Sequence, residues 1–168
     1  MKKLLASDYD NTFYINDNDI KNNIQKVESF RNKNNIFAIA TGRSYYDFTE
    51  DLKKYPIKYD YLIINQGATI LDSNGTIIEN YIIDNNIKNI LIKDLELYDQ
   101  DNTFTCSILE SRVSIKNNNI TKIHKEYETV EEAKKMDSII NDRYSSYIIS
   151  YLIPSNKAIE IISSKTNK

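Results

Sequence analysis

The chain has 168 residues, enough for one or two domains that each bury a core. Its formal net charge of -2 and its pI near 5.5 argue against a basic surface for nucleic acid or an anionic membrane. The chain has one cysteine, Cys106, so an intramolecular disulfide cannot form. No apolar run reaches the roughly 18 residues that a membrane span needs, and the apolar run near the N-terminus is too short for the core of a signal peptide. We therefore expect a cytoplasmic protein.

The first half of the chain alternates strand and helix patterns. Short apolar runs predict fully covered strands, and apolar residues at helical spacing predict amphipathic helices between them. The strands are predicted at residues 3–7, 36–40 and 59–65, and the helices at 17–35 and 44–55. Asp17 or Asp19 can cap the first helix and Ser44 the second. The alternation predicts an α/β fold with a parallel, doubly wound sheet.

The pattern changes after residue 66. Asn74 and Gly75, between two alternating apolar runs, predict a tight hairpin in which both residues have positive φ. A helix followed by two strands then occurs twice, which predicts an α+β module with an antiparallel sheet. Its helices are predicted at 85–99 and 129–144, and its strands at 103–108, 111–116, 147–153 and 158–162. The expected organisation is a core at 1–81, an inserted domain at 82–158, and a return to the core at 159–168.

Polar segments follow each of the three predicted parallel strands. They read DYDNT at 8–12, ATGRS at 40–44 and NQGA at 65–68. Ligands bind beyond the carboxyl ends of the strands in an open parallel sheet, so we expect these segments to converge. Two carboxylates at a strand end can hold a hard divalent cation such as Mg²⁺ while one of them attacks an electrophile.

The spacing of these residues indicates a division of roles. Asp8 and Asp10 point the same way if the segment is extended, so Asp8 can act as nucleophile and Asp10 as general acid and base. Thr41 offers a hydroxyl to a phosphoryl oxygen. Gly42 allows close backbone approach, and Arg43 can add a charge-assisted contact. The N-terminus of the following helix favours an anion at the same place.

These motifs closely resemble those of the haloacid dehalogenase-like hydrolases, specifically the Cof-type phosphatases with a cap inserted after the third strand. The first motif of that family is D-x-D-x-T, which matches residues 8–12, and the second is an apolar strand ending in Thr-Gly-Arg, which matches "IFAIATGR". The Cof-type turn matches "NQGA". The resemblance implies a phosphatase of small phosphorylated metabolites, in which Asp8 accepts the phosphoryl group. It also implies that Mg²⁺ is bound by Asp8 and by the main-chain carbonyl of Asp10.

The chain departs from the family pattern in two places. Asn11 stands where Cof-type members carry glycine, and asparagine tolerates the left-handed backbone of such a turn. The charge-balancing lysine of the third motif falls at Lys168, eight positions after Glu160, with Lys165 a weaker candidate. The fourth motif, a Gly-Asp segment that supplies further magnesium carboxylates, is not in the sequence.

The resemblance completes the expected site. We expect catalytic roles for Asp8, Asp10, Thr41 and Lys168, substrate binding by Thr12, Gly42, Arg43 and Asn65, and a metal site at Asp8 and Asp10. The alternative is a truncated, catalytically deficient member that serves as a binding or interaction module. Such a chain would leave an incomplete sheet edge, through which it would self-associate.

Other motifs favour structural interpretations. The segment 8–19 begins like a calcium loop, but Phe13 replaces the required glycine and Asp19 the final glutamate. A mononucleotide-binding domain is disfavoured because the sequence has no G-x-G-x-x-G. His124 is expected at the surface without an acidic partner, and Cys106 in packing. Residues 110–112 join two strands and are expected to form a plain turn rather than to touch substrate.

Overall fold

A computed structural model describes residues 1–109 and 111–167, and it divides the chain into two compact units. The first unit spans Met1–Asn80 and the second begins at Tyr81. Each unit has a sheet of its own. Within the described residues, no helix combines the length and the apolar character needed to cross a membrane.

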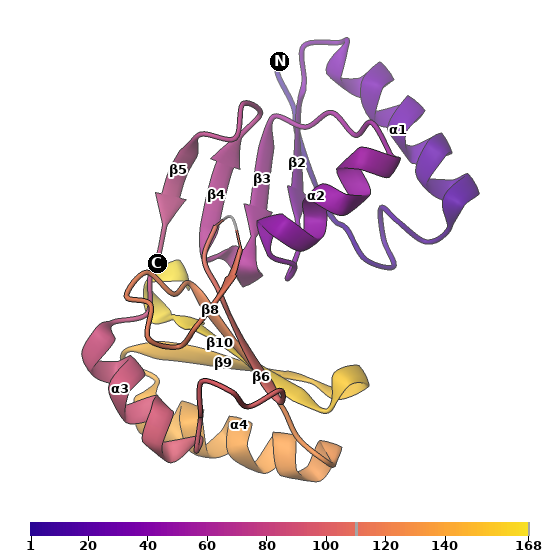
Figure 1. Ribbon diagram of the computed structural model, residues 1–168. Helices are drawn as coiled ribbons and strands as arrows, with labels where there is room; N and C mark the ends of the chain where they lie inside the picture. The colour runs from indigo at the N-terminus through magenta and orange to yellow at the C-terminus, as the bar shows by residue number, and fades with distance from the viewer. Residues whose placement is uncertain (110, 168) are drawn as a thin grey trace. The chain divides into compact units, whose positions relative to one another are not determined.

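The first unit is an α/β unit built on five strands in the order β1-β2-β3-β4-β5 (Figure 1). Its elements are β1 (Leu4–Asp8), α1 (Asp17–Arg31), β2 (Ile36–Ala40), α2 (Tyr45–Lys54), β3 (Tyr61–Ile64), a 3₁₀ turn (Asn65–Gly67), β4 (Thr69–Asp72) and β5 (Ile77–Asn80). The first three strands are parallel, and β4 and β5 add an antiparallel hairpin. The predicted parallel sheet is confirmed. The parallel strands lie in the sheet in their chain order, β1-β2-β3.

Helix α1 begins at Asp17, as the sequence pattern predicted, but its cap and its end differ from the predicted ones. Its N-cap is Asn16, whose Oδ1 accepts from the backbone N–H groups of Asn18 and Asp19 at 3.0 and 3.1 Å. The predicted caps Asp17 and Asp19 were wrong, because both lie inside the first turn. The helix ends at Arg31 rather than at residue 35, and Asn34 has a φ of +61°. The chain reverses there to enter β2.

The hairpin between β4 and β5 forms, but its turn differs from the expected one. Gly75 has a φ of +79°, whereas Asn74 is not among the described residues with positive φ, so that part of the prediction was wrong. The Gly75 N–H donates to the Asp72 carbonyl at 3.1 Å, and the Asp72 carboxylate accepts from the N–H groups of Asn74 and Thr76. A hairpin turn with one left-handed glycine replaces the two-residue turn.

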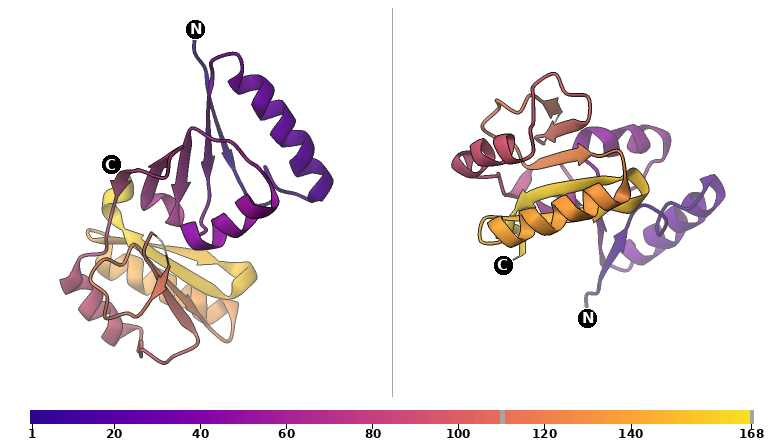
Figure 2. Two further views of the ribbon diagram at one scale, coloured as in Figure 1. Left: turned by 45° about the horizontal axis from the view of Figure 1, so that its top comes forward. Right: turned by 90° about the horizontal axis from the view of Figure 1, so that it is seen from below.

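The second unit is a five-stranded antiparallel sheet in the order β7-β6-β8-β10-β9, with two helices against one face (Figure 2). Its elements are α3 (Asn85–Asp94), β6 (Phe104–Ser107), β7 (Arg112–Val113), β8 (Lys122–Glu126), α4 (Val130–Tyr144), β9 (Ile148–Ile153), a 3₁₀ turn (Pro154–Asn156), β10 (Ala158–Ser163) and a 3₁₀ turn (Ser164–Asn167). Ile87, Leu91, Ala133 and Ile140 of the helices share one core with Ile123, Ile159 and Ile161 of the strands. This is the expected α+β module.

Two features of the second sheet were not expected. Strand β8 was missed because its sequence, KIHKE, has a single apolar residue, and only one of its faces meets the core. Strand β10 was expected to open a return to the first unit at residue 159. Instead it pairs along its length with both β8 and β9, which makes it a central strand of the second sheet.

Candidate active site at the ends of the parallel strands

The backbone register brings the carboxyl ends of β1, β2 and β3 side by side. Asp8 is opposite Ala40 in the β1–β2 pair, and Ala40 is opposite Ile63 in the β2–β3 pair. Beyond these residues the pairing continues, because Tyr9 N–H donates to the Ala40 carbonyl at 3.1 Å and Thr41 N–H to the Ile63 carbonyl at 2.9 Å. The segments that follow the three strands therefore leave the sheet at one edge.

Asp8 is the last residue of β1, and it is exposed. The hydroxyl of Thr12 donates to its Oδ2 at 3.3 Å, so the first and last residues of the D-x-D-x-T motif are in contact. The turn between them needs one left-handed residue, and Asn11 supplies it with a φ of +61°. Phe13, which is 4% exposed, anchors the far side of the turn in the core.

Asp10 is engaged by the segment that follows β2. Its carboxylate accepts from Arg43 through two bonds, Nη2 to Oδ1 at 2.5 Å and Nε to Oδ2 at 3.0 Å, and Thr41 Oγ1 lies 3.5 Å from Oδ2. Partial burial would lower the pKa of Arg43, but the hydrogen bonds that it donates to Asp10 and the charges of Asp10 and Asp51 outweigh burial and raise the pKa. Arg43 was expected to contact substrate, and its guanidinium is instead bonded within the protein.

Two residues of this site, Asp51 and Tyr9, were not predicted from the sequence. Arg43 Nη1 donates to Asp51 Oδ2 at 2.8 Å, and the Tyr9 hydroxyl donates to the same oxygen at 2.9 Å. The Tyr9 ring lies beneath the guanidinium, 5.2 Å from Cζ to the ring centroid. Burial, and then the bond to Asp51, raise the pKa of Tyr9. A sequence signal existed, because Asp51 follows the buried Phe48 by three residues and so shares its helix face.

The third segment, Asn65–Gly67, turns through three successive left-handed residues with φ values of +51°, +56° and +89°. The N–H of Asn65, a fully buried residue, donates to the Arg43 carbonyl at 2.9 Å, which joins this turn to the second segment. A Cβ at Gly42 would lie 2.4 Å from Nε2 of Gln66. The absence of a side chain at Gly42 therefore leaves space for the side chain of Gln66.

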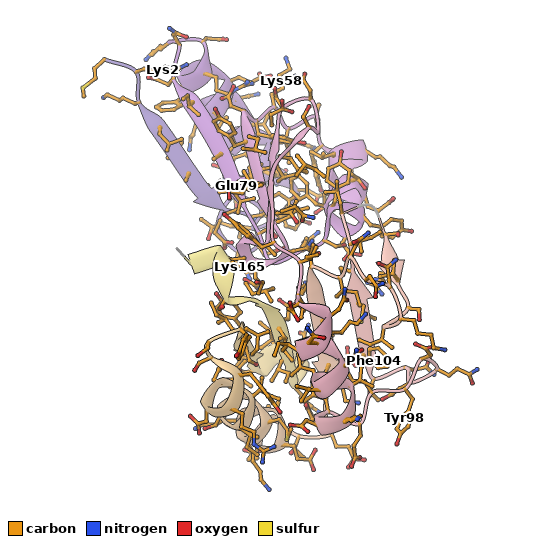
Figure 3. The ribbon with its side chains drawn as sticks, turned by 90° about the vertical axis from the view of Figure 1, so that its left-hand side faces the viewer. Lys2, Lys58, Glu79, Tyr98, Phe104 and Lys165 are labelled. Carbon is orange, nitrogen blue, oxygen red and sulfur yellow. The ribbon has the colours of Figure 1, made fainter. Side chains whose placement is uncertain are left out.

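Only part of a cation site is present among residues 1–109 and 111–167, where no group of three or more His, Cys, Asp or Glu side chains could hold a metal ion. The exposed Asp8 carboxylate fits a hard divalent cation, while the Asp10 carboxylate is held by Arg43. Lys168 lies outside the described residues. Lys165 is exposed in the last 3₁₀ turn of the second unit (Figure 3).

In the second unit, His124 has an acidic partner that was not predicted, whereas Cys106 is a core residue as predicted. His124 was expected at the surface without an acidic partner, and this was wrong, because its Nδ1 lies 3.3 Å from Oε1 of the buried Glu160. The same oxygen accepts from Lys122 at 2.7 Å. Cys106 is buried in the core, and burial raises its pKa to about 12, which keeps it a packing residue.

Comparison with protein families identifies the class to which this fold and site belong. The family model for haloacid dehalogenase-like hydrolases matches residues 5–110, which include all three strand ends. The chain belongs to this family of hydrolases. A protein of unknown function from Mycoplasma capricolum subsp. capricolum is 38% identical over 104 residues, a match that spans 57% of this chain and 38% of that protein.

Solved structures of the same family share the fold. A HAD/COF-like hydrolase from Plasmodium vivax has a TM-score of 0.76 at 17% identity, covering 97% of this chain and 68% of that chain. A haloacid dehalogenase-like hydrolase from B. subtilis has a TM-score of 0.75 at 13% identity, covering 98% and 74%. A subclass IIB sugar phosphatase has a TM-score of 0.65 at 13% identity, covering 97% and 70%. The fold is therefore the haloacid dehalogenase α/β fold, a parallel core sheet with an antiparallel cap sheet.

Proposed function

We propose that this chain belongs to a Mg²⁺-dependent phosphatase that hydrolyses a small phosphorylated metabolite, such as a sugar phosphate, through an aspartyl-phosphate intermediate. The observation that carries the proposal is the β1–β2–β3 register, which brings an exposed Asp8 beside the Thr41 segment, to which the Asn65 turn is hydrogen-bonded. Family membership supports hydrolase chemistry, and the sugar phosphatase of the same fold supports a phosphorylated small molecule as substrate.

In the proposed reaction, a carboxylate oxygen of Asp8 attacks phosphorus in line with the leaving oxygen. A new Asp8–phosphorus bond forms as the bond from phosphorus to the substrate oxygen breaks, and Asp10 gives its proton to that oxygen. Asp10 then removes a proton from water, which attacks the aspartyl-phosphate. Phosphate leaves, and both aspartates return to their starting states.

Neighbouring groups would bind the phosphoryl oxygens during these steps. Thr12, whose hydroxyl contacts Asp8, and Thr41, which follows the residue opposite Asp8 in the next strand, are candidate donors. The N-terminus of α2 favours an anion because its first N–H groups lack helical partners. Arg43 donates one hydrogen bond from each of its three nitrogens to Asp10 and Asp51, and the two remaining N–H groups of its guanidinium are its means of contacting a phosphoryl oxygen. Asn65 shapes the third segment, Gly42 leaves room beside it, and Lys168, or Lys165, would offset negative charge.

The proposed metal is Mg²⁺, bound by the Asp8 carboxylate and the Asp10 main-chain carbonyl. When bound, it would neutralise charge on the carboxylate and phosphoryl groups and orient them for attack. The remaining coordination positions would be filled by water and substrate, because Mg²⁺ commonly keeps several waters in sites of few protein ligands.

A second function, a binding or interaction module without catalysis, is favoured by one observation. In the described part of the chain the candidate site has no third metal-binding side chain. A site with so few carboxylates binds Mg²⁺ weakly, and a weakly bound metal gives little catalysis.

The test is release of p-nitrophenol from p-nitrophenyl phosphate by the full chain, with and without Mg²⁺. Asp8→Asn should lower the Mg²⁺-dependent rate by a factor on the order of 10³ or more, because the amide cannot form the covalent intermediate. Asp142→Asn, the same change at an exposed position of α4, is the matched control and should leave the rate unchanged. Equal rates in wild type and Asp8→Asn would remove Asp8 from the chemistry, and no rate in wild type would favour the module.

A further inference from the structure

Three side chains surround the Arg43 guanidinium in the first unit. Asp10 binds its Nε and Nη2, Asp51 binds its Nη1 at 2.8 Å, and the Tyr9 ring lies beneath it. Arg43 presents a rigid planar fork of donors, so binding on two edges and one face fixes its orientation. The guanidinium therefore acts as a spacer between Asp51 and Asp10.

The two ends of this chain of contacts differ in how firmly the fold holds them. Asp51 sits within α2, and its carboxylate also accepts from Tyr9, whose ring is fully buried and packs edge-to-face on Phe48 at 5.0 Å. Asp10 lies outside any strand, in the turn after β1, where an isolated bridge to Tyr14 is its regular backbone pairing. Asp51 is therefore held in place by the fold, whereas the position of the Asp10 carboxyl group depends on its contact with Arg43.

We propose that Asp51, with Tyr9, is a positioning residue that fixes Arg43 and, through it, aims the Asp10 carboxyl group for proton transfer. The inference rests on the proposed function in assigning proton transfer to Asp10. Asp51 itself touches neither the reacting atoms nor the proposed metal ligands, and acts on the reaction through Arg43.

A misaimed proton donor has a kinetic signature that general damage to the fold lacks. The proton from Asp10 matters most when the leaving oxygen is strongly basic, and least when the leaving group departs readily as an anion. Phenyl phosphate has the more basic leaving group and p-nitrophenyl phosphate the less basic one. Loss of positioning should therefore slow the first substrate more than the second.

The first experiment compares kcat and KM for these two substrates, using the full chain with Mg²⁺. Asp51→Ala should lower kcat/KM for phenyl phosphate by about tenfold or more, a part of what a general acid contributes, with little change in kcat/KM for p-nitrophenyl phosphate. The ratio kcat/KM is compared because it reports the steps up to departure of the leaving group and leaves out the later hydrolysis step, in which Asp10 acts as base for both substrates. Tyr9→Phe, which keeps the buried ring and removes the bond to Asp51, should lower it in the same direction by less. Asp51→Asn keeps an acceptor for Arg43 and should restore part of the rate.

Glu50→Ala is the matched control. Glu50 precedes Asp51 on the same helix, but it pairs with Lys53 at the surface, at 2.6 Å, and takes no part in the Arg43 contacts. It should leave both substrates unchanged. An equal loss on both substrates in Asp51→Ala, or the same selective loss in Glu50→Ala, would overturn the proposal.

A second experiment is independent of activity, so it separates this inference from the proposed function. Urea unfolding of Asp10→Asn, Asp51→Asn and the double variant measures whether the two carboxylates are coupled. We expect the effects of the single changes not to add, and the non-additivity to disappear when Arg43→Met is present in every variant. If wild type hydrolyses neither phosphate, the proposed function fails. Additive effects would refute the positioning chain in either case.

Discussion

Asp60 joins three parts of the first unit through one carboxylate. It accepts from Arg31 of α1 through Nη2 at 2.7 Å and Nε at 3.0 Å, and from the backbone N–H of Phe37 in β2 at 2.8 Å. The hydrogen bonds from Arg31 outweigh partial burial and lower the pKa of Asp60, and the Phe37 N–H adds to this effect. The residue thus binds the end of α1 to the start of β2, from a position directly before β3.

We predict that Asp60→Asn lowers the free energy of unfolding by about 1–2 kcal/mol at pH 7, the range for hydrogen bonds to charged groups that are partly exposed. Because the pKa is lowered in the folded state, this stability is present above the unfolded pKa of about 3.9 and is lost as the pH falls through the folded value. Urea unfolding at pH 7 and pH 3 should show the difference from wild type shrinking at pH 3. Asp142→Asn should show no such difference at either pH.

At the scale of single residues, the sequence indicates which side chains share an edge but not which ones bond. Asp8, Thr41 and Asn65 each follow a short apolar run, so local pattern and the parallel-sheet rule are sufficient to bring their segments together. The bonds from Arg43 to Asp10 and from Tyr9 to Asp51 join positions 33 and 42 apart. Such pairs depend on how α2 docks, which no local pattern encodes.

At the scale of elements, the N-terminus of α1 shows how tertiary contacts decide between neighbouring capping candidates. Asp17 is turned toward the next helix, where it accepts from the hydroxyl of Tyr55 at 2.5 Å and from Lys54. Asn16 has the extended backbone that an N-cap needs, with a φ of -155°, and its Nδ2 also donates to the Asp19 carboxylate. The sequence pattern indicated two candidates, Asp17 and Asp19, and the helix uses neither, because Asp17 accepts from Tyr55 and Asp19 accepts from Asn16.

The cap makes a testable contribution to stability. We predict that Asn16→Ala lowers the free energy of unfolding by about 1 kcal/mol, because two backbone N–H groups lose their acceptor. Asn18→Ala, in the first turn of the same helix, is the matched control, because it is the backbone N–H of Asn18 that uses the cap. Urea unfolding monitored by circular dichroism measures both. Equal losses in the two variants would show that Asn16 contributes no more than an ordinary first-turn residue.

The run of asparagines at 117–119 is a second case in which tertiary contacts, and not local sequence, decide what a segment does. Residues 117–119, from which no function could be predicted, lie in the loop that meets the buried Lys88 of α3. Lys88 Nζ donates to the Asn117 carbonyl at 2.8 Å and to Asn118 Oδ1 at 3.3 Å. The charge is satisfied by neutral oxygens of a loop 29 residues away. Of these asparagines, Asn118 is the one whose side chain contacts Lys88, and this contact depends on how α3 packs against the loop.

At the scale of the whole molecule, the strand order of the first unit leaves two edges. Among the described residues β1 has one strand neighbour, β2, and β5 has one, β4. Residues Leu4 and Leu5 of β1 are 66% and 41% exposed, and this strand contains no proline. Unpaired backbone groups beside exposed leucines are a template for another strand. On β5, Ile78 is also exposed, and the strand carries Glu79, labelled in Figure 3.

We predict that the chain self-associates through β1 as its concentration rises. Light scattering coupled to size-exclusion chromatography should give a mass that increases with loading, and Leu4→Lys should hold the mass at that of one chain, because a lysine on an edge strand disfavours pairing with a like strand. Ile78→Lys places the same charge on the opposite edge and is the matched control, which should associate like wild type. If Ile78→Lys alone abolishes association, the pairing edge is β5. A mass of one chain at every loading for wild type would show that neither edge pairs, and that Leu4 and Leu5 remain in contact with solvent at no cost in solubility.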